Sequence, residues 1–206
     1  NDSTFFIPYH KIPRLLEPLK RSGFTCDANA RADTPFDASS VKALEEAGCT
    51  ALFFGFESMC SATLEKMDKR TTPADNRRIN RLFANSAITT KMSFIVGFPG
   101  ETPEDFAQTQ SYLVHEHVGR YSLYVFEYGG DILPIGKEKD KYQLELLPER
   151  GGYHWAHAGE HWRHCGMDSD TARLLRAQTI RLTRTHPHSM AVYRTWQDAY
   201  AWPFVP

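Results

Sequence analysis

The sequence has few cysteines, and none of them forms a motif with another. The four residues, Cys26, Cys49, Cys60 and Cys165, include no CxxC pair and no dense run. This spacing excludes the disulfide framework of a small secreted domain and the usual ligand spacing of a zinc site. We therefore expect most of the four to be buried free thiols.

Long apolar runs and a surplus of charge are also absent. No run approaches the roughly 20 apolar residues of a membrane-spanning helix, and residues 1–3 lack the order of a signal peptide. The formal net charge is -1, with both signs spread along the chain, which disfavours a nucleic-acid-binding surface. We expect a cytoplasmic protein with a small-molecule substrate, and no membrane or nucleic acid as a partner.

From residue 12 onward, helical stretches alternate with short apolar runs, which is typical of an α/β fold with a parallel sheet wrapped by helices. Predicted strands cover 25–32, 50–57, 91–98 and 121–128, and predicted helices cover 12–21, 39–47, 61–67, a stretch from Pro73, 102–117 and 171–183. Ser3–Phe6 resembles the end of a further strand, and the missing initiator methionine suggests that the true beginning lies upstream. These strands are too few to close an eight-stranded barrel of about 250 residues.

The sequence changes character after residue 133, where charged, His-rich and Trp-rich stretches follow. We therefore predict a core of residues 1–133 and a C-terminal extension of residues 134–206. The extension should be mostly helical or irregular, and we expect its last twenty residues to form an irregular tail.

The first complete strand alternates polar and small side chains. Asp27, Asn29 and Arg31 share one face, and alanines occupy the other. This pattern indicates either a polar lumen or a solvated edge strand. A buried Arg31 would need an anionic partner.

The second strand, TALFFGFE, places Phe53, Gly55 and Glu57 on one face at its carboxyl end, followed by Ser58. Ligands of parallel α/β folds gather at the carboxyl ends of strands, and a carboxylate there can accept hydrogen bonds from a ribose diol. The alternative is that Glu57 only caps the next helix.

The third strand leads into Gly-Phe-Pro-Gly-Glu. Ile95 and Gly97 should offer an apolar surface and a gap for a flat base. No Gly-Lys-Ser/Thr follows, so this is not a phosphate loop. Glu101 fits a helix start as well as it fits a catalytic role.

The extension contains a cluster of histidine, tryptophan and cysteine. Its members are His154, Trp155, His157, His161, Trp162, His164 and Cys165. The sequence leaves three interpretations open, namely a metal site, contact with a substrate or second cofactor, and plain aromatic packing.

Three segments resemble, in order and spacing, the strand-three, strand-four and strand-five signatures of the radical S-adenosylmethionine (SAM) superfamily. They are ANARAD (28–33), EEAGCTALFFGFES with LEKMDKRTT (45–58 and 64–72), and SFIVGFPGETPEDFAQT (93–109). The match covers about residues 1–130 and is most similar to the group with a cobalamin-binding domain ahead of the radical SAM domain. It implies a partial (βα)6 TIM-like barrel that here lacks its first strand or strands.

The resemblance also implies cofactors and contacts. In that family a 4Fe-4S cluster cleaves SAM to methionine and a 5′-deoxyadenosyl radical. Carried over by position, the SAM contacts are Asn29 and Arg31 for the methionine part, Glu57 and Ser58 for the ribose, and Ile95, Gly97 and Phe98 for the adenine. Cobalamin as a second cofactor and a reductant such as flavodoxin or ferredoxin complete the implied set.

The chain departs from the family in one respect, because the CxxxCxxC motif that holds the cluster is not in this sequence. We expect its ligands upstream, so the isolated chain should be inactive and hold no metal. The first hypothesis is a piece of a radical SAM enzyme, such as a cobalamin-dependent methyltransferase acting on a small molecule. The second is a cluster-free, non-catalytic module that binds a nucleoside or a protein.

Overall fold

A parallel five-stranded sheet organises the chain in the computed structural model, which describes residues 12–131, 133–148 and 161–192. Its strands, in spatial order, are β1 (Cys26–Ala30), β2 (Cys49–Glu57), β3 (Thr89–Val96), β4 (Gly119–Val125) and β7 (Ser189–Ala191). Every neighbouring pair in this sheet is parallel. Successive core strands are therefore neighbours, as expected for part of a βα barrel.

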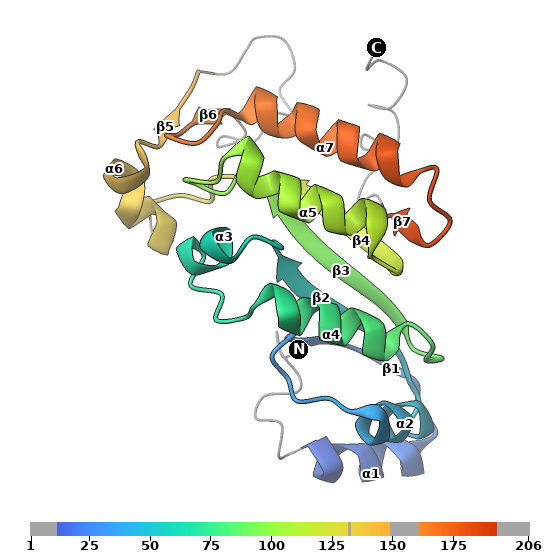
Figure 1. Cartoon of the computed structure of the whole chain (residues 1–206). Helices are drawn as coiled ribbons and strands as arrows, with labels where there is room; N and C mark the ends of the chain where they lie inside the picture. The colour runs from blue at the N-terminus through green and yellow to red at the C-terminus, as the bar shows by residue number, and fades with distance from the viewer. Residues whose placement is uncertain (1–11, 132, 149–160, 193–206) are drawn as a thin grey trace.

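Helices cover one face of the sheet (Figure 1). They are α1 (Ile12–Ser22), α2 (Ala38–Glu46), α3 (Ser61–Lys66), α4 (Pro73–Phe83), α5 (Pro103–His115) and α7 (Ser169–Thr183). Between α5 and α7 lie η2 (Pro134–Glu138), α6 (Lys139–Tyr142) and the antiparallel pair β5 (Glu145–Leu146) and β6 (Trp162–Arg163). Asp37, Thr72 and Thr102 cap α2, α4 and α5 by accepting a hydrogen bond from a backbone N–H three residues later.

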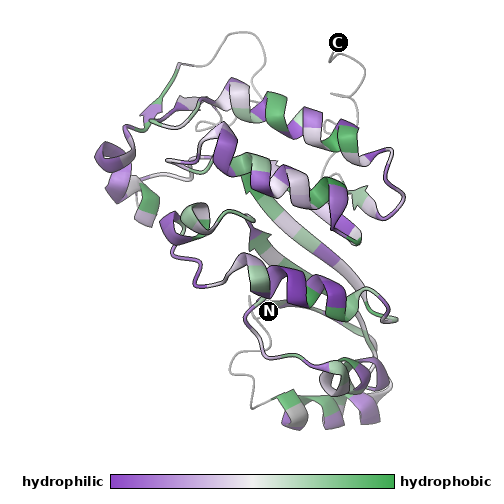
Figure 2. Cartoon of the chain, viewed as in Figure 1, coloured by the Kyte–Doolittle hydropathy of each residue, from purple (hydrophilic) through white to green (hydrophobic). Residues whose placement is uncertain are grey.

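The two faces of the sheet differ in burial. In β2, Leu52, Phe54 and Phe56 are buried against the helices, while Phe53 and Gly55 are half-buried on the opposite face. Figure 2 shows apolar residues along the strands, behind helices that carry both polar and apolar residues. The side chains that the sequence predicts for a lumen therefore lie on the face that the helices leave open.

Within the described residues, each predicted strand and helix is present, with ends that differ by a few residues. Ser3–Phe6, predicted to end a further strand, lies outside the described residues. The prediction that the last twenty residues form an irregular tail is wrong in part, because residues 189–191 form β7, which pairs with β4. The boundary at residues 133 and 134 stays a prediction. No helix in the described ranges has the length and apolarity needed to cross a membrane.

The thiols are only partly as expected. Cys49 and Cys60 are buried and Cys26 is partly buried, but Cys165 is exposed, and none of the four forms a disulfide.

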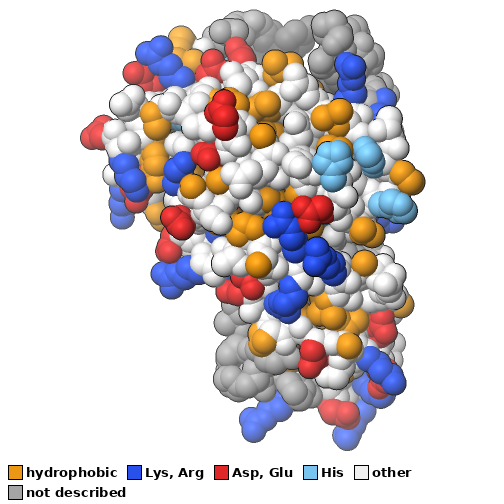
Figure 3. All heavy atoms as spheres, in the orientation of Figure 1, with side chains coloured by type: hydrophobic (Ala, Val, Ile, Leu, Met, Phe, Trp, Pro, Cys, Tyr) orange, Lys and Arg blue, Asp and Glu red, His pale blue; other side chains and the backbone are white. Residues whose placement is uncertain are grey.

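On the face drawn in Figure 3, basic and acidic side chains are intermixed.

Candidate functional site

The open face of the sheet carries a hollow of about 470 Å³. It is lined by Asn29, Ala30, Arg31, Phe53, Phe54, Gly55, Lys69, Lys91, Ser93 and Tyr124. This volume falls within the range of about 300–1,000 Å³ that is usual for small-molecule sites. Its charged lining side chains, Arg31, Lys69 and Lys91, are all basic. Arg31 and Lys69 are paired with the Asp33 and Glu57 carboxylates, so among the described residues Lys91 is the lining cation without a carboxylate partner.

Arg31 has the anionic partner that the sequence requires. Its guanidinium donates two hydrogen bonds of 2.9 Å to the Asp33 carboxylate and a third to the carbonyl oxygen of Lys69. This bidentate pair fixes the plane of the guanidinium at the rim of the hollow. Asn29, two residues before Arg31 and on the same face, lies in register with Phe53 of β2.

Glu57 is held at the end of β2 in an uncommon conformation, with φ of 62°. One carboxylate oxygen accepts a hydrogen bond of 3.0 Å from the Lys69 ammonium, and within the described ranges no hydrogen bond is made to the other. A side chain at Gly55 would collide with this ion pair, so the glycine does clear space here. Glu57 does not cap α3, whose N-cap is Cys60 and makes no side-chain cap bond.

Ser58 lies on the other side of the sheet. Its side chain is buried, with Oγ 3.3 Å from the Thr109 hydroxyl oxygen and accepting a hydrogen bond from the Cys60 N–H. The structure thus brings Asn29, Arg31 and Glu57 to the same face but leaves the Ser58 hydroxyl in the helix layer.

The turn after β3 differs from its prediction. Gly97 has φ of +83°, so the alternation of the strand stops there, and the space beside its Cα is filled by the Trp162 indole and by Ala172 of α7. The predicted gap for a base is therefore occupied from within the chain. Ile95 pairs in register with Tyr124, and Phe98 packs edge-on against Phe126 at 5.7 Å.

Glu101 is the functional candidate that the sequence left undecided. Its side chain is fully buried, and one carboxylate oxygen accepts a hydrogen bond of 2.7 Å from the Gly97 N–H. Burial raises the pKa of this carboxyl to about 7. Glu101 therefore ties the two ends of the turn together in place of capping α5, which Thr102 caps.

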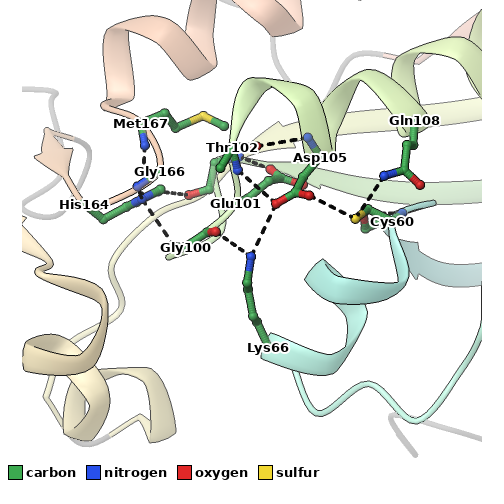
Figure 4. A network of polar contacts seen from close by, with 12 residues as sticks. Cys60, Lys66, Gly100, Glu101, Thr102, Asp105, Gln108, His164, Gly166 and Met167 are labelled. Atoms are coloured by element: carbon green, nitrogen blue, oxygen red, sulfur yellow. Dashed lines mark hydrogen bonds and ion pairs between the residues drawn. The ribbon is translucent and has the colours of Figure 1, made fainter.

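Two other elements hold the same turn (Figure 4). Lys66 at the end of α3 donates hydrogen bonds to the Gly100 carbonyl oxygen and to Asp105. From the extension, the His164 ring contacts the backbone at Gly97 and at Gly100. Neither contact is predicted by a local pattern, because both partners lie far away in the sequence.

The histidine and tryptophan cluster is only partly within the described residues. Trp162 is fully buried and His164 nearly so, which agrees with aromatic packing for these two. His154, Trp155 and His157 lie outside the described ranges. Among the described residues, no group of three or more histidine, cysteine or acidic side chains is placed to hold a metal ion.

Residues 7–113, just over half of the chain, match the Radical SAM superfamily. An uncharacterized methyltransferase of Pyrococcus horikoshii is 30% identical over 110 residues, covering 52% of this chain and 24% of that protein. The tRNA-2-methylthio-N(6)-dimethylallyladenosine synthase of Neorickettsia sennetsu is 40% identical over 95 residues, covering 42% of this chain and 20% of that protein. The chain thus spans about a quarter or less of the length of these relatives.

Solved structures share the fold. The radical SAM methyltransferase TsrM from Kitasatospora setae, with cobalamin and a 4Fe-4S cluster bound, has a TM-score of 0.67 at 18% identity, covering 95% of this chain and 45% of that one. TsrM with tryptophan substrate and a SAM analogue, aza-SAM, has a TM-score of 0.60 at 21% identity, covering 73% and 32%. This likeness agrees with the expected partial barrel, and the family match identifies the chain as a member of the radical SAM superfamily.

Proposed function

We propose that this chain supplies the SAM-binding wall of a radical SAM enzyme that methylates a small molecule with the help of cobalamin. The observation that carries the proposal is the hollow on the open face, which Asn29, Arg31 and Lys69 help to line and where Lys69 is ion-paired with Glu57. Family membership supports the use of SAM, and the shared fold of TsrM, which binds cobalamin, supports methylation.

The residues present suit SAM. The Nη1 group of Arg31, which makes none of the described hydrogen bonds, can donate to the carboxylate of the methionine part, and the second carboxylate oxygen of Glu57 matches a ribose diol. Ile95 and Phe98 offer apolar surface for the adenine, while Gly97 acts in our proposal through the turn and not as a gap. Bound SAM supplies the methyl group and, at a reduced cluster, the radical.

The described residues do not suit the 4Fe-4S cluster, since they contain no ligand set for it. We propose that its cysteines lie outside these 206 residues, together with a cobalamin-binding domain. Residues 1–133 would then be core and residues 134–206 an extension. Flavodoxin or ferredoxin as the reductant and a cytoplasmic location belong to the same proposal.

Glu57→Gln tests the ribose contact. Gln keeps the shape but removes the charge that strengthens a hydrogen bond from a hydroxyl, so SAM affinity should fall by about 1.5–3 kcal/mol, roughly ten- to a hundredfold. Calorimetric titration of the anaerobically reconstituted whole protein with SAM measures the change. The free energy of unfolding should fall by no more than about 1 kcal/mol, because the Lys69 pair is partly exposed.

Two further variants separate the alternatives. Glu65→Gln removes an exposed carboxylate of α3 away from the hollow and should leave SAM affinity unchanged. Lys69→Gln removes the ion pair but retains the Glu57 carboxylate. SAM should therefore bind more tightly to the Lys69→Gln variant than to the Glu57→Gln variant. If Glu57→Gln loses stability and keeps its SAM affinity, the residue is structural and the ribose assignment is wrong.

A further inference from the structure

Several residues of the extension contact the β3 turn, and Trp162, His164 and Gly166 make contacts of three different kinds. The Trp162 indole fills the space that Gly97 leaves open, and its N–H donates a hydrogen bond of 2.8 Å to the Phe126 carbonyl oxygen. The His164 ring stacks on this indole, with centroids 5.0 Å apart and planes at 9°. Gly166 lies so close to the Glu101 backbone that a side chain there would collide with the carbonyl group.

The hydrogen bonds of His164 define its protonation state. Nδ1 faces three backbone N–H groups, those of Gly100 at 3.3 Å, Gly166 at 3.0 Å and Met167 at 3.3 Å, so it must be an acceptor. Nε2 lies 3.3 Å from the Gly97 carbonyl oxygen, which requires a donor. Only the neutral ring with its proton on Nε2 satisfies both sides, because a proton on Nδ1 would oppose three donors.

We propose that neutral His164 is a positioning residue, which locks the Gly97–Gly100 turn and so sets the shape of the adenine side of the SAM pocket. The inference rests on the proposed function for the identity of the ligand. The lock, meaning the contacts of His164 with the backbone of Gly97 and Gly100, does not depend on it. His164 touches only backbone atoms of the turn in this network, and Figure 4 shows it on a different side of the turn from Lys66.

The surroundings of His164 favour the neutral ring. Burial, the largest cause, lowers its pKa, and the Lys66 ammonium acts in the same direction. The backbone contact to Gly97, the second-largest cause, raises the pKa, as does Asp168, the N-cap of α7, which is the smallest of the four, and burial outweighs both. Glu101 is also close through the turn, and its own raised pKa limits its charge near neutral pH.

Two variants probe the lock from its two sides. His164→Leu removes donor and acceptor while keeping an apolar side chain, and His164→Asn keeps an acceptor near the Nδ1 position. If the turn is then competent in about one molecule in ten, the apparent dissociation constant for SAM rises about tenfold in His164→Leu. His164→Asn should recover most of this loss, because the three N–H groups regain an acceptor. His115→Leu, at the exposed end of α5, is the matched control and should change nothing.

Three measurements decide the inference. Long-range nitrogen–proton NMR at pH 7, with His164 assigned from the Asn variant, should show a proton on Nε2 and none on Nδ1. Hydrogen exchange of the Gly100 amide should quicken about tenfold in His164→Leu. Titration of the reconstituted whole protein with SAM should show the tenfold loss and its partial rescue.

The outcomes are distinguishable. A proton on Nδ1, or unchanged Gly100 exchange in His164→Leu, would overturn the lock whatever binds in the hollow. Faster exchange with unchanged SAM affinity would show a lock that does not position the pocket, and would also overturn the inference. A wild-type protein that binds no SAM would refute the proposed function, and the positioning role would fall with it while the NMR result stands.

Discussion

Trp162→Ala should lower the free energy of unfolding by about 3–5 kcal/mol, the usual cost of truncating a buried tryptophan. The side chain has no exposed surface, and its indole is packed between the Gly97 turn, the Phe126 ring and His164. Truncation leaves a cavity and removes the indole N–H that donates a hydrogen bond to the Phe126 carbonyl oxygen. Urea unfolding followed by circular dichroism measures the loss.

Trp162→Phe and Leu174→Ala serve as comparisons for this variant. Phe keeps an aromatic ring over Gly97 but not the N–H, so it should cost clearly less than Ala. Leu174 is half exposed on α7, and its truncation should change stability by no more than about 0.5 kcal/mol. If Trp162→Ala is as mild as Leu174→Ala, then the extension does not pack on the turn as described.

Glu101→Gln should change how stability depends on pH. The buried carboxyl has a pKa of about 7, raised from 4.5, so the native state retains a proton that the unfolded chain releases between these values. Its stabilisation is therefore fully present below pH 4.5 and is lost as pH rises through about 7. The lost amount is on the order of 3 kcal/mol, from about 1.4 kcal/mol per pKa unit.

The variant isolates this contribution because glutamine does not titrate, while its carbonyl oxygen can still accept the Gly97 N–H. Buried His117, whose pKa burial lowers to about 4, acts in the opposite direction below pH 6.5 and remains in both proteins. The stability of Glu101→Gln relative to wild type should therefore rise with pH from 4.5 to 8, as chemical unfolding at several pH values can measure. Glu104→Gln, an exposed change in the first turn of α5, should not show this rise. If the difference in stability between Glu101→Gln and wild type stays constant from pH 4.5 to 8, the raised pKa of the Glu101 carboxyl is wrong.

The sequence predicts the strand and helix series because the strands have an apolar period, and several helices have both a period and a cap, that act locally. Asp37 and Thr72 cap their helices through contacts that span only three residues. The alternation within β1 and β2 also predicts that Asn29 and Glu57 share the open face. The same alternation places Ser58 on the helix side, so its ribose assignment came only from the resemblance and the strand geometry argues against it.

The rest of the site depends on contacts between distant parts of the chain. Gly97 leaves the strand with a positive φ, and its neighbour is Trp162, sixty-five residues later. The contact of His164 with Gly97 and the ion pair of Lys69 with Glu57 likewise join segments that no periodic pattern relates. Such contacts arise from tertiary packing, and one sequence taken alone does not contain them.

A crystal structure of the whole protein with SAM, after anaerobic reconstitution with iron and sulfide, tests the central claim most directly. We predict that SAM lies in the hollow on the open face, with a ribose hydroxyl within about 3.2 Å of the Glu57 carboxylate. The methionine carboxylate should point toward Arg31, and the adenine should lie against Ile95 and Phe98. SAM bound at another place, with the hollow free of ligand, would contradict the account.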